Sequence, residues 1–411
     1  MQRVATLSLG HKMSGNEFQI LIIGAGPAGS LAAARLARGG ARVALFDGRP
    51  PTKAKPCGGG VTSKALKAWP ELLAAVGRRV DNLELYSPAG RKLYLELDEP
   101  FAIYSRRALD DFLREQARKA GAEIIAEKVA WRPKNEGETL WTMRGVDGAA
   151  YHAPFLVGAD GANSPIAKKL AGPLPNAEME VAFGYRTPLP EADDAPTVVA
   201  FLPGYAGYAW AFPRLDHISF GIATSQDAFD HTALDALLWD FMLGYYRQRA
   251  DKNAPLWGVK DEKLKAELTA TAERYAARIP GLAPETFDTR QAAGPGWALL
   301  GDAAGFADPV TGEGIYYALR SAELFAEAYL SGAPESYESK WRNDFGRELK
   351  RASQMRNRFY GQMWGGPFTE RMVQFSRFHP GIQKVLADLV AGEQGYVTLK
   401  KQLARHALWP F

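Results

Sequence analysis

The hydrophobic and polar pattern opens with a strand, a helix and a second strand. Residues 18–23, apolar except for Gln19, have the pattern and length of a short buried strand. Glycines over 24–29 predict a tight turn into a helix over 30–38, and 42–46, apolar after Arg42, is the next predicted strand. Buried strands on both sides of a helix are typical of a parallel sheet covered by helices.

Further along the chain the period of the pattern changes to two. Four runs of alternating residues separated by Pro and Gly predict an antiparallel sheet, at 181–187, 197–202, 207–212 and 217–223. A hairpin is expected over 83–97. The other expected elements are a helix over 109–119, strands over 123–126, 155–157 and 297–300, mostly helix over 234–276 with a turn at Pro255, a helix over 313–329, and a helical tail with Ile382, Val385, Leu386, Leu389 and Val390 on one face.

The glycines of the first turn have the spacing of a dinucleotide-binding fingerprint. Gly24, Gly26 and Gly29 lie between the predicted strand and helix, and Asp47 follows Gly24 by 23 positions. In such a turn the first glycine permits the bend, the second lets backbone N–H groups approach a pyrophosphate, and the third lets helix and strand pack closely. Asp47 then accepts hydrogen bonds from a ribose. The fingerprint does not choose between NAD and FAD.

Composition and charge exclude several classes of protein. The 411 residues are 46% hydrophobic and 23% charged, with one cysteine, so a disordered chain, a disulfide framework and a cysteine-rich metal site are excluded. No stretch of about 20 apolar residues is present, and a cytoplasmic protein is expected. Residues 340–411 hold 13 Lys/Arg and 5 Asp/Glu. This basic region is either a solvated helical face or a surface for anionic lipid, a phosphate-bearing substrate or an acidic partner. It lacks a nucleic-acid-binding motif, so no nucleic acid is expected.

Two later segments resemble a flavoprotein core. Gly158-Ala-Asp160-Gly161 and Gly301-Asp302-Ala-Ala-Gly305 each follow a predicted strand, and Arg106-x-x-Leu109-Asp110 opens a helix. With the fingerprint they resemble the FAD-binding core of the para-hydroxybenzoate-hydroxylase-like flavoproteins. The resemblance implies that Asp302 holds a ribityl hydroxyl, that Arg106 reaches FAD, and that the following helix N-terminus stabilises negative charge on the reduced flavin. The cofactor residues it implies are Gly24, Gly26, Ala28, Gly29, Asp47, Arg49, Cys57, Gly58, Arg106, Val129, Asp160, Gly161, Asp302, Gly312, Gly314 and Ile315.

Three motifs narrow the resemblance to the geranylgeranyl reductase family. They are Lys55-Pro-Cys57-Gly-Gly-Gly60, Tyr208-Ala-Trp210-Ala-Phe212-Pro213 and the segment 301–315. The family reduces isolated double bonds of prenyl chains, which requires hydride at one carbon and a proton at the other. The chain departs from the family at Tyr205, where a proline is common three residues before the tyrosine.

The resemblance also suggests which side chains act on a substrate. It implies that Cys57 lies near the isoalloxazine, where it assists proton delivery or gating or is only a small loop residue. The aromatic residues Tyr205, Tyr208, Trp210 and Phe212 are expected to help line an apolar slot. For Tyr208 and Trp210, core packing alone is the alternative. The predicted catalytic residues are Cys57, Tyr208 and Trp210. Glu313 is either an acid or, as the favoured interpretation, a charge at a helix N-terminus.

The predicted architecture is α/β. A discontinuous Rossmann-like FAD-binding domain, 16–80, 101–175 and 287–330, is interrupted by an antiparallel substrate domain, 81–100 and 176–286. A C-terminal helical region, 331–411, closes the chain. We expect NADPH or a ferredoxin as electron donor, because no second glycine-rich dinucleotide motif is present. The expected partner is a prenyl lipid or prenyl diphosphate, with peripheral membrane contact through the basic region.

Two other functions remain open from the sequence. An FAD monooxygenase or halogenase would use the same scaffold, although Tyr208 stands where flavin halogenases have the first Trp of their Gly-Trp-x-Trp motif. A prenyl-binding GDP-dissociation inhibitor shares the architecture without flavin, and the intact Gly301-Asp302 motif argues against it.

Overall fold

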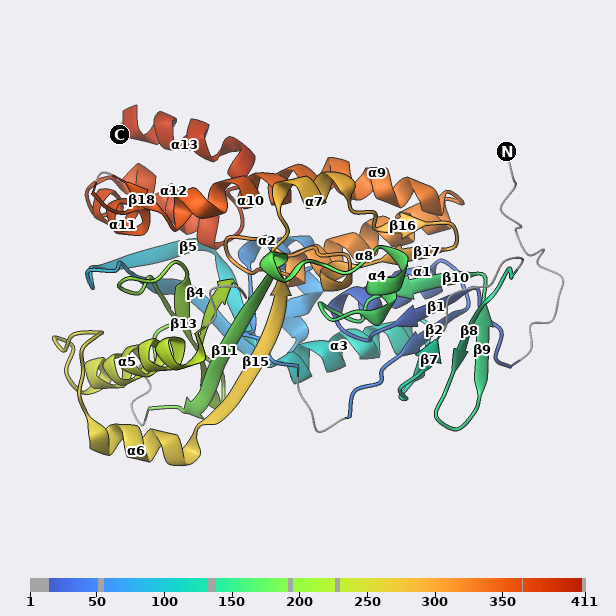
Figure 1. The fold of residues 1–411 in the computed structure, drawn as a ribbon, viewed down its shortest axis with the longest axis horizontal. Helices are drawn as coiled ribbons and strands as arrows, with labels where there is room; N and C mark the ends of the chain where they lie inside the picture. The colour runs from blue at the N-terminus through green and yellow to red at the C-terminus, as the bar shows by residue number, and fades with distance from the viewer. Residues whose placement is uncertain are drawn as a thin grey trace.

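Two large β-sheets lie side by side, and helices from the C-terminal part of the chain run along the edge of both (Figure 1). A computed structural model describes residues 15–50, 55–131, 138–190, 195–225, 230–363 and 365–408. In this part of the chain no helix is both long enough and apolar enough to cross a membrane.

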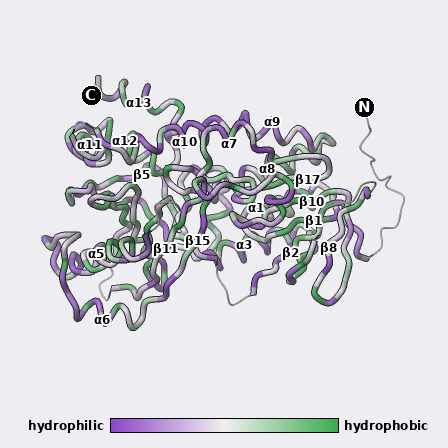
Figure 2. The backbone as a smooth tube through the Cα atoms, in the orientation of Figure 1, coloured by the Kyte–Doolittle hydropathy of each residue, from purple (hydrophilic) through white to green (hydrophobic). Residues whose placement is uncertain are grey.

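The first sheet has six strands in the order β16-β17-β10-β1-β2-β6. All are parallel except β16, which pairs antiparallel with β17 at the edge. The central strands are buried on both faces, which explains their unbroken apolar runs; Figure 2 shows them in hydrophobic colour. The strands are β1 (Ile20–Ile23), β2 (Val43–Phe46), β6 (Glu123–Ile125), β10 (Phe155–Gly158), β16 (Ala293–Gly294) and β17 (Trp297–Leu299).

Three helices pack side by side on this sheet. Helix α1 (Pro27–Arg38) makes its main contacts with α3 (Arg106–Lys119) and α8 (Ile315–Leu330). Helix α1 begins three residues earlier than expected, because Pro27 takes the first helical position, where a missing N–H costs nothing. Helix α8 begins at Ile315 rather than at residue 313.

A small three-stranded sheet packs beside β1 and β2. It consists of β7 (Ala130–Trp131), β8 (Trp141–Arg144) and β9 (Ala150–Ala153). The Tyr151 ring lies edge-on to Phe46, with centroids 5.2 Å apart. The sequence analysis did not predict this sheet, because strands of two to four residues are too short for a periodic pattern to stand out.

The second large sheet has eight strands in the order β15-β11-β14-β13-β12-β4-β5-β3. The predicted antiparallel pairing of the region 181–223 is confirmed, and one parallel pair, β12 with β4, joins it to the earlier hairpin. The strands are β3 (Gly60–Val61), β4 (Gly77–Tyr86), β5 (Lys92–Tyr104), β11 (Met179–Pro188), β12 (Val198–Ala200), β13 (Tyr208–Pro213), β14 (His217–Ser225) and β15 (Glu273–Pro280).

The prediction for 234–276 was partly wrong. Helices α5 (His231–Ala250) and α6 (Glu262–Thr271) are present, but from Glu273 the chain is the edge strand β15, paired with β11. Tyr275, Ala277 and Ile279 alternate along β15 and face a cavity, so pairing with a distant strand decides the conformation.

The hairpin is longer than expected. Its strands β4 and β5 run past the boundaries expected at 80/81 and 100/101. We therefore propose that the whole hairpin, 77–104, belongs with the eight-stranded sheet.

The two faces of this sheet have different covers. Helices α5 and α6 pack on one face, through a cluster that includes Phe220, Leu238 and Phe241. The C-terminal helices contribute to a second cluster with Leu83, Leu85 and Phe201. The remaining helices are α2 (Ser63–Ala68), α4 (Pro165–Leu170), α7 (Pro284–Thr289), α9 (Tyr337–Trp341), α10 (Arg347–Phe359), α11 (Phe368–Phe378), α12 (Pro380–Val390) and α13 (Tyr396–Leu408), with a small hairpin of β18 (Gln362–Met363) and β19 (Gly366–Pro367).

Candidate active site

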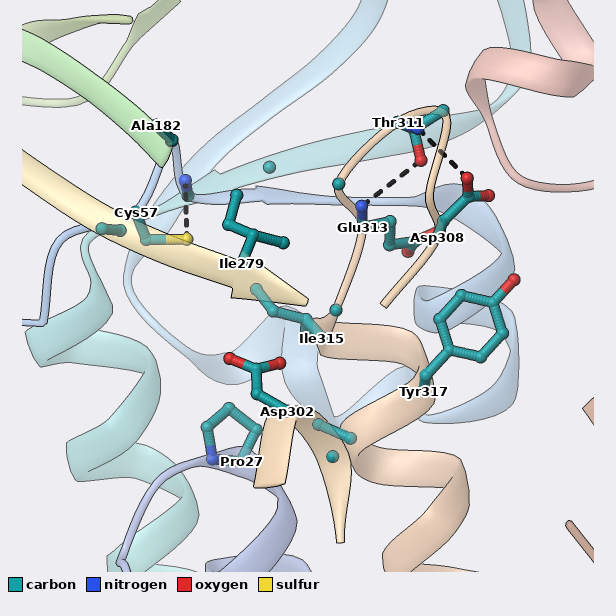
Figure 3. Close-up of a pocket in the computed structure, with 18 of the residues that line it drawn as sticks. Pro27, Cys57, Ala182, Ile279, Asp302, Asp308, Thr311, Glu313, Ile315 and Tyr317 are labelled. Atoms are coloured by element: carbon teal, nitrogen blue, oxygen red, sulfur yellow. Dashed lines mark hydrogen bonds between the residues drawn. The ribbon is translucent and has the colours of Figure 1, made fainter. Parts of the chain in front are cut away.

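A cavity of about 710 Å³ lies where the two large sheets meet the C-terminal helices. Figure 3 shows part of it, with Cys57 and Ile279 on one side, Glu313, Asp308 and Tyr317 on the other, and Asp302 below. Of the predicted site residues, the structure brings together along this cavity Gly24, Gly26, Ala28, Asp47, Arg49, Cys57, Gly58, Arg106, Val129, Asp160, Gly161, Tyr208, Trp210, Asp302, Gly312, Gly314 and Ile315. Gly29 lies behind them, in the packing between α1 and the turn.

The glycine-rich turn after β1 has no room for side chains at two positions. Gly24 has φ +106°, and a Cβ there would lie 2.3 Å from the Ala159 carbonyl oxygen. At Gly29 a Cβ would lie 1.9 Å from the Gly24 carbonyl oxygen. At Gly26 a Cβ would meet only the Arg106 guanidinium, at 3.8 Å, and would project toward the cavity. The turn therefore places backbone, not side chains, against the cavity.

The N-terminus of α1 faces the cavity without a side-chain cap. Helix N-termini leave backbone N–H groups that need acceptors, and their dipole favours anions. This end of α1 therefore fits a phosphate-bearing ligand.

Ion pairs organise the acidic residues at this end of the cavity. Asp47 lies 2.6 Å from the Arg114 guanidinium, and its other oxygen accepts from the Arg49 backbone N–H. Asp110 pairs with Arg106 at 2.9 Å and with Arg49 at 3.1 Å. The sequence did not reveal that Arg114 pairs with Asp47 or that Asp110 pairs with Arg49, because these partners are more than 60 residues apart in the chain.

Both carboxylate oxygens of Asp160 are buried, and neither accepts a hydrogen bond of normal geometry from the described residues. Burial raises the pKa of Asp160 to about 6, although Ser164 and the Ile166 N–H lie close enough to oppose the shift. A buried polar group without partners is costly. Since Asp160 lines the cavity, a bound ligand with hydrogen-bond donors would satisfy it.

Asp302 lies at the floor of the cavity shown in Figure 3. Its carboxylate pairs with Lys55 at 3.2 Å. A Cβ at Gly314 would lie 2.9 Å from Asp302 Oδ1, so glycine is needed for this close approach. Lys55 belongs to the quoted motif around Cys57, but its pairing with Asp302 was not predicted.

The loop that carries Cys57 is held from behind by an arginine. The buried Arg214 donates to the carbonyl oxygens of Cys57 and Gly58, at 2.7 and 3.1 Å. The Gly59 N–H donates to Cys57 Sγ at 3.3 Å. Burial lowers the pKa of Arg214. Arg214 directly follows the aromatic motif, yet only the tertiary structure reveals that it positions this loop.

Strand β13 presents alternate aromatic side chains to the cavity. Tyr208, Trp210 and Phe212 all line it, as expected for residues two apart on one face of a strand. The Tyr208 hydroxyl donates to the Thr311 carbonyl, and burial raises its pKa. Tyr205 does not belong to this lining. Its hydroxyl instead donates to the Ala223 carbonyl and its ring packs beside the cluster under α5, so the expectation for Tyr205 was wrong.

Glu313 lies directly before the N-cap Gly314 of α8, so it is outside the first turn of that helix. It precedes α8, whose first turn has no acidic residue, and its carboxylate accepts a hydrogen bond from Thr62 Oγ1 at 2.7 Å. Burial raises the pKa of Glu313 to about 7. Its accessible surface faces the cavity that it lines.

Apolar side chains line the part of the cavity beyond Glu313. Four of these side chains come from the eight-stranded sheet and its continuation, and the C-terminal helices contribute the facing wall. This region is therefore a slot between two layers, and we call it the apolar slot. Its residues are Leu83, Leu85, Val199, Phe201, Phe359, Leu386, Leu389 and Val390. The pattern predicted the apolar face of α12 but not what it faces.

Comparisons with known proteins agree with this geometry. The family described as FAD binding domain matches residues 17–202. A protein of Synechocystis named geranylgeranyl diphosphate reductase is 32% identical over 335 residues, which cover 76% of this chain and 75% of the relative. The chain belongs to the geranylgeranyl reductase family of FAD-dependent oxidoreductases.

Solved structures of other proteins have a similar fold at low sequence identity. A geranylgeranyl bacteriochlorophyll reductase-like protein of Thermoplasma acidophilum has a TM-score of 0.70 at 21% identity, covering 95% of this chain and 99% of its own. A flavin-dependent brominase has a TM-score of 0.65 at 18% identity, covering 95% and 99%. The predicted FAD-binding α/β fold with sheets and C-terminal helices is confirmed.

The residues of this family member fit FAD. The uncapped N-terminus of α1, the open position at Gly26 and the unsatisfied carboxylate of Asp160 lie along one cavity. A pyrophosphate needs the first two features, and hydroxyl groups of a ribityl chain would supply donors to the third.

Proposed function

We propose that this protein saturates isolated carbon–carbon double bonds of a prenyl chain of the geranylgeranyl type. The observation that carries the proposal is the apolar slot, which continues directly from the residues expected to hold FAD. A long hydrocarbon chain needs an apolar site from which water is excluded. The name of the Synechocystis relative supports this class of substrate.

The cofactor residues are proposed as the sequence analysis named them. Gly24, Gly26 and Ala28 would approach the pyrophosphate, and Asp47 the ribose. Asp302 would release Lys55 to hold the ribityl chain. Bound FAD, when reduced, supplies the hydride for one carbon of the double bond.

The chain's own residues then shape the reaction site. Tyr208 and Trp210 form a rigid aromatic wall that orients the double bond and excludes water. Cys57 narrows the opposite side, on a loop that Arg214 holds in place. We propose Cys57, Tyr208 and Trp210 as catalytic residues that contact substrate or cofactor.

The electron donor is proposed to be NADPH or a ferredoxin. The sequence has no second glycine-rich dinucleotide motif, so a nicotinamide would bind transiently at the same cavity. The two donors are distinguished by mixing the holoenzyme with NADPH alone and measuring the absorbance of the bound flavin. Loss of flavin absorbance indicates NADPH as the donor.

The decisive experiment uses chemically reduced holoenzyme, kept free of oxygen, with geranylgeranyl diphosphate. Mass spectrometry of the products should show a gain of hydrogen pairs without oxygen. A prenylated quinone or a prenyl glycerolipid replaces the diphosphate in parallel reactions, because the head group is part of what is tested. Turnover that requires oxygen and adds an oxygen or a halogen atom to an acceptor would replace this proposal with the monooxygenase or halogenase function.

A further inference from the structure

Glu313 is a half-buried acid whose position the proposed reaction has not yet used. It lies on the segment between Asp308 and α8, on the side of the cavity opposite Cys57 (Figure 3). The Thr62 hydroxyl donates to Glu313 Oε1 at 2.7 Å. Oε1 is therefore the oxygen through which Thr62 can pass a proton to Glu313.

The surroundings of Glu313 favour its neutral form near neutral pH. Burial is the largest cause of its raised pKa, and Asp308 on the same segment raises it further. The Thr62 hydrogen bond and Lys64 on α2 oppose the shift. The phenols that face it, Tyr208 of β13 and Tyr317 of α8, stay neutral because burial raises their pKa.

Polar residues line the cavity next to Glu313. Thr62 lines it together with Lys64, Gly392 and Gln394. Gly392 passes so close that a Cβ there would lie 3.3 Å from Thr62 Oγ1. Lys64, Gly392 and Gln394 are half-buried, so solvent can reach the polar surroundings of Thr62.

We propose that Glu313 is the proton donor of the reduction and that Thr62 relays the proton that restores it. This inference rests on the proposed function. The O–H bond of Glu313 breaks as the electron pair of the double bond forms a new C–H bond to that proton. The other C–H bond would form with the hydride that bound, reduced FAD would supply, so the alkene would gain two electrons. The resulting carboxylate takes a proton from solvent through the Thr62 hydroxyl.

This assignment separates Glu313 from Cys57. Cys57 lies on the other side of the cavity, where its sulfur accepts from the Gly59 N–H. Substitution of each residue therefore tests its role separately. A carboxyl donor is lost as pH rises through the pKa of Glu313.

The test measures single turnovers of pre-reduced holoenzyme with geranylgeranyl diphosphate between pH 5 and pH 9. The rate of saturated product should be constant below pH about 7 and fall tenfold per unit above it. Glu313→Gln should lower the rate 100-fold or more and flatten the profile. Glu327→Gln makes the same change on the outer side of α8 and should leave the rate and profile unaltered. FAD absorbance confirms that each variant is loaded.

A second variant tests the relay without removing the acid. Thr62→Val removes a hydrogen bond that stabilises the carboxylate, so the descending limb should move to higher pH while the rate falls. Thr62→Ser keeps the hydroxyl and should retain the wild-type midpoint. Infrared spectra of the holoenzyme provide a readout besides activity: a carboxylic acid C=O band should titrate near pH 7 and be absent from Glu313→Gln.

Each outcome decides the inference. Saturated product formed by Glu313→Gln at the wild-type rate, or an infrared band that this variant retains, overturns it. If the fall of the rate at high pH persists in Glu313→Gln and disappears in Cys57→Ala, Cys57 is the proton donor instead. If wild-type enzyme forms no saturated product with any prenyl substrate, the proposed function and this inference fall together.

Discussion

Three glycines follow β1, and a Cβ atom would have a different consequence at each of them. At Gly24 the backbone conformation itself, with φ +106°, excludes other residues. At Gly29 the obstacle is the Gly24 carbonyl, which is backbone and cannot move aside. At Gly26 φ is −82° and the nearest atom lies at an ordinary contact distance. Folding therefore depends on Gly24 and Gly29, and ligand approach on Gly26.

This difference predicts opposite results for two alanine variants. Gly29→Ala should lower the free energy of unfolding of the apoprotein by about 3 kcal/mol, the upper end for overpacking. Gly26→Ala should change it by less than about 0.5 kcal/mol but weaken FAD binding at least tenfold, or about 1.4 kcal/mol. Chemical denaturation and FAD titration measure the two effects. Normal FAD affinity in Gly26→Ala would contradict the proposed pyrophosphate position.

At the scale of elements, α12 decides the shape of the apolar slot. The helix crosses β5 and holds its place through Gln383, which donates to the Tyr94 carbonyl at 2.6 Å. Val385 and Leu386 are buried, while Leu389 and Val390 are half-buried and line the slot. One helix therefore supplies both core packing and one wall of the slot, the wall opposite the β-sheet.

Leu389→Trp should shorten the slot without disturbing the cofactor. We expect the KM for a geranylgeranyl substrate to rise at least tenfold, about 1.4 kcal/mol, because the larger ring takes the place of part of the chain. FAD binding and turnover of a geranyl substrate should be retained. Leu215→Trp, at a side chain 60% exposed in the turn after β13, is the control. Equal loss for short and long chains would mean that the chain does not lie along α12.

At the scale of the whole molecule, ion pairs change the meaning of the basic C-terminal region. Five of its cations pair with carboxylates from outside residues 340–411. The pairs are Lys340–Glu327, Arg342–Glu338, Lys350–Asp288, Arg356–Glu180 and Lys384–Asp98. Carboxylates of the rest of the chain thus neutralise five of the 13 cations of this region. On α13, Lys400, Lys401 and Arg405 are exposed, and we propose this helix for any contact with an anionic membrane.

Replacement of Lys400, Lys401 and Arg405 together by Gln should weaken binding to phosphatidylserine-containing vesicles about 100-fold, at about 1 kcal/mol for each charge. Co-sedimentation at low and high salt measures the effect, since binding of this kind is screened by salt. Lys350→Gln, which removes a cation already paired with Asp288, should change binding little. Equal binding of wild-type protein to neutral vesicles would exclude the electrostatic contact.

The sequence predicted much of the fold but less of the site. The turn at Gly24, the strand predicted at 18–23 and the antiparallel run around Trp210 come from local periodicity and glycine geometry. The structure confirms them, with the strand at Ile20–Ile23. The edge strand β15 was not predicted, because its partner β11 lies far away in the chain. The sheet of β7 to β9 was not predicted, because its strands are too short for a periodic pattern to stand out. The individual cofactor and catalytic assignments stay predictions, although most of these residues share one cavity.

The sequence by itself determined the class of protein, because a glycine fingerprint and its flanking strands act over a few neighbouring residues. It also identified Cys57 and the aromatic motif on β13 as candidates. Only the tertiary structure decided that Glu313 is a half-buried acid in the cavity beside Thr62, and that Arg214 holds the Cys57 loop. Burial and ion pairing depend on segments that are distant in sequence, and desolvation by those segments raises the pKa of Glu313.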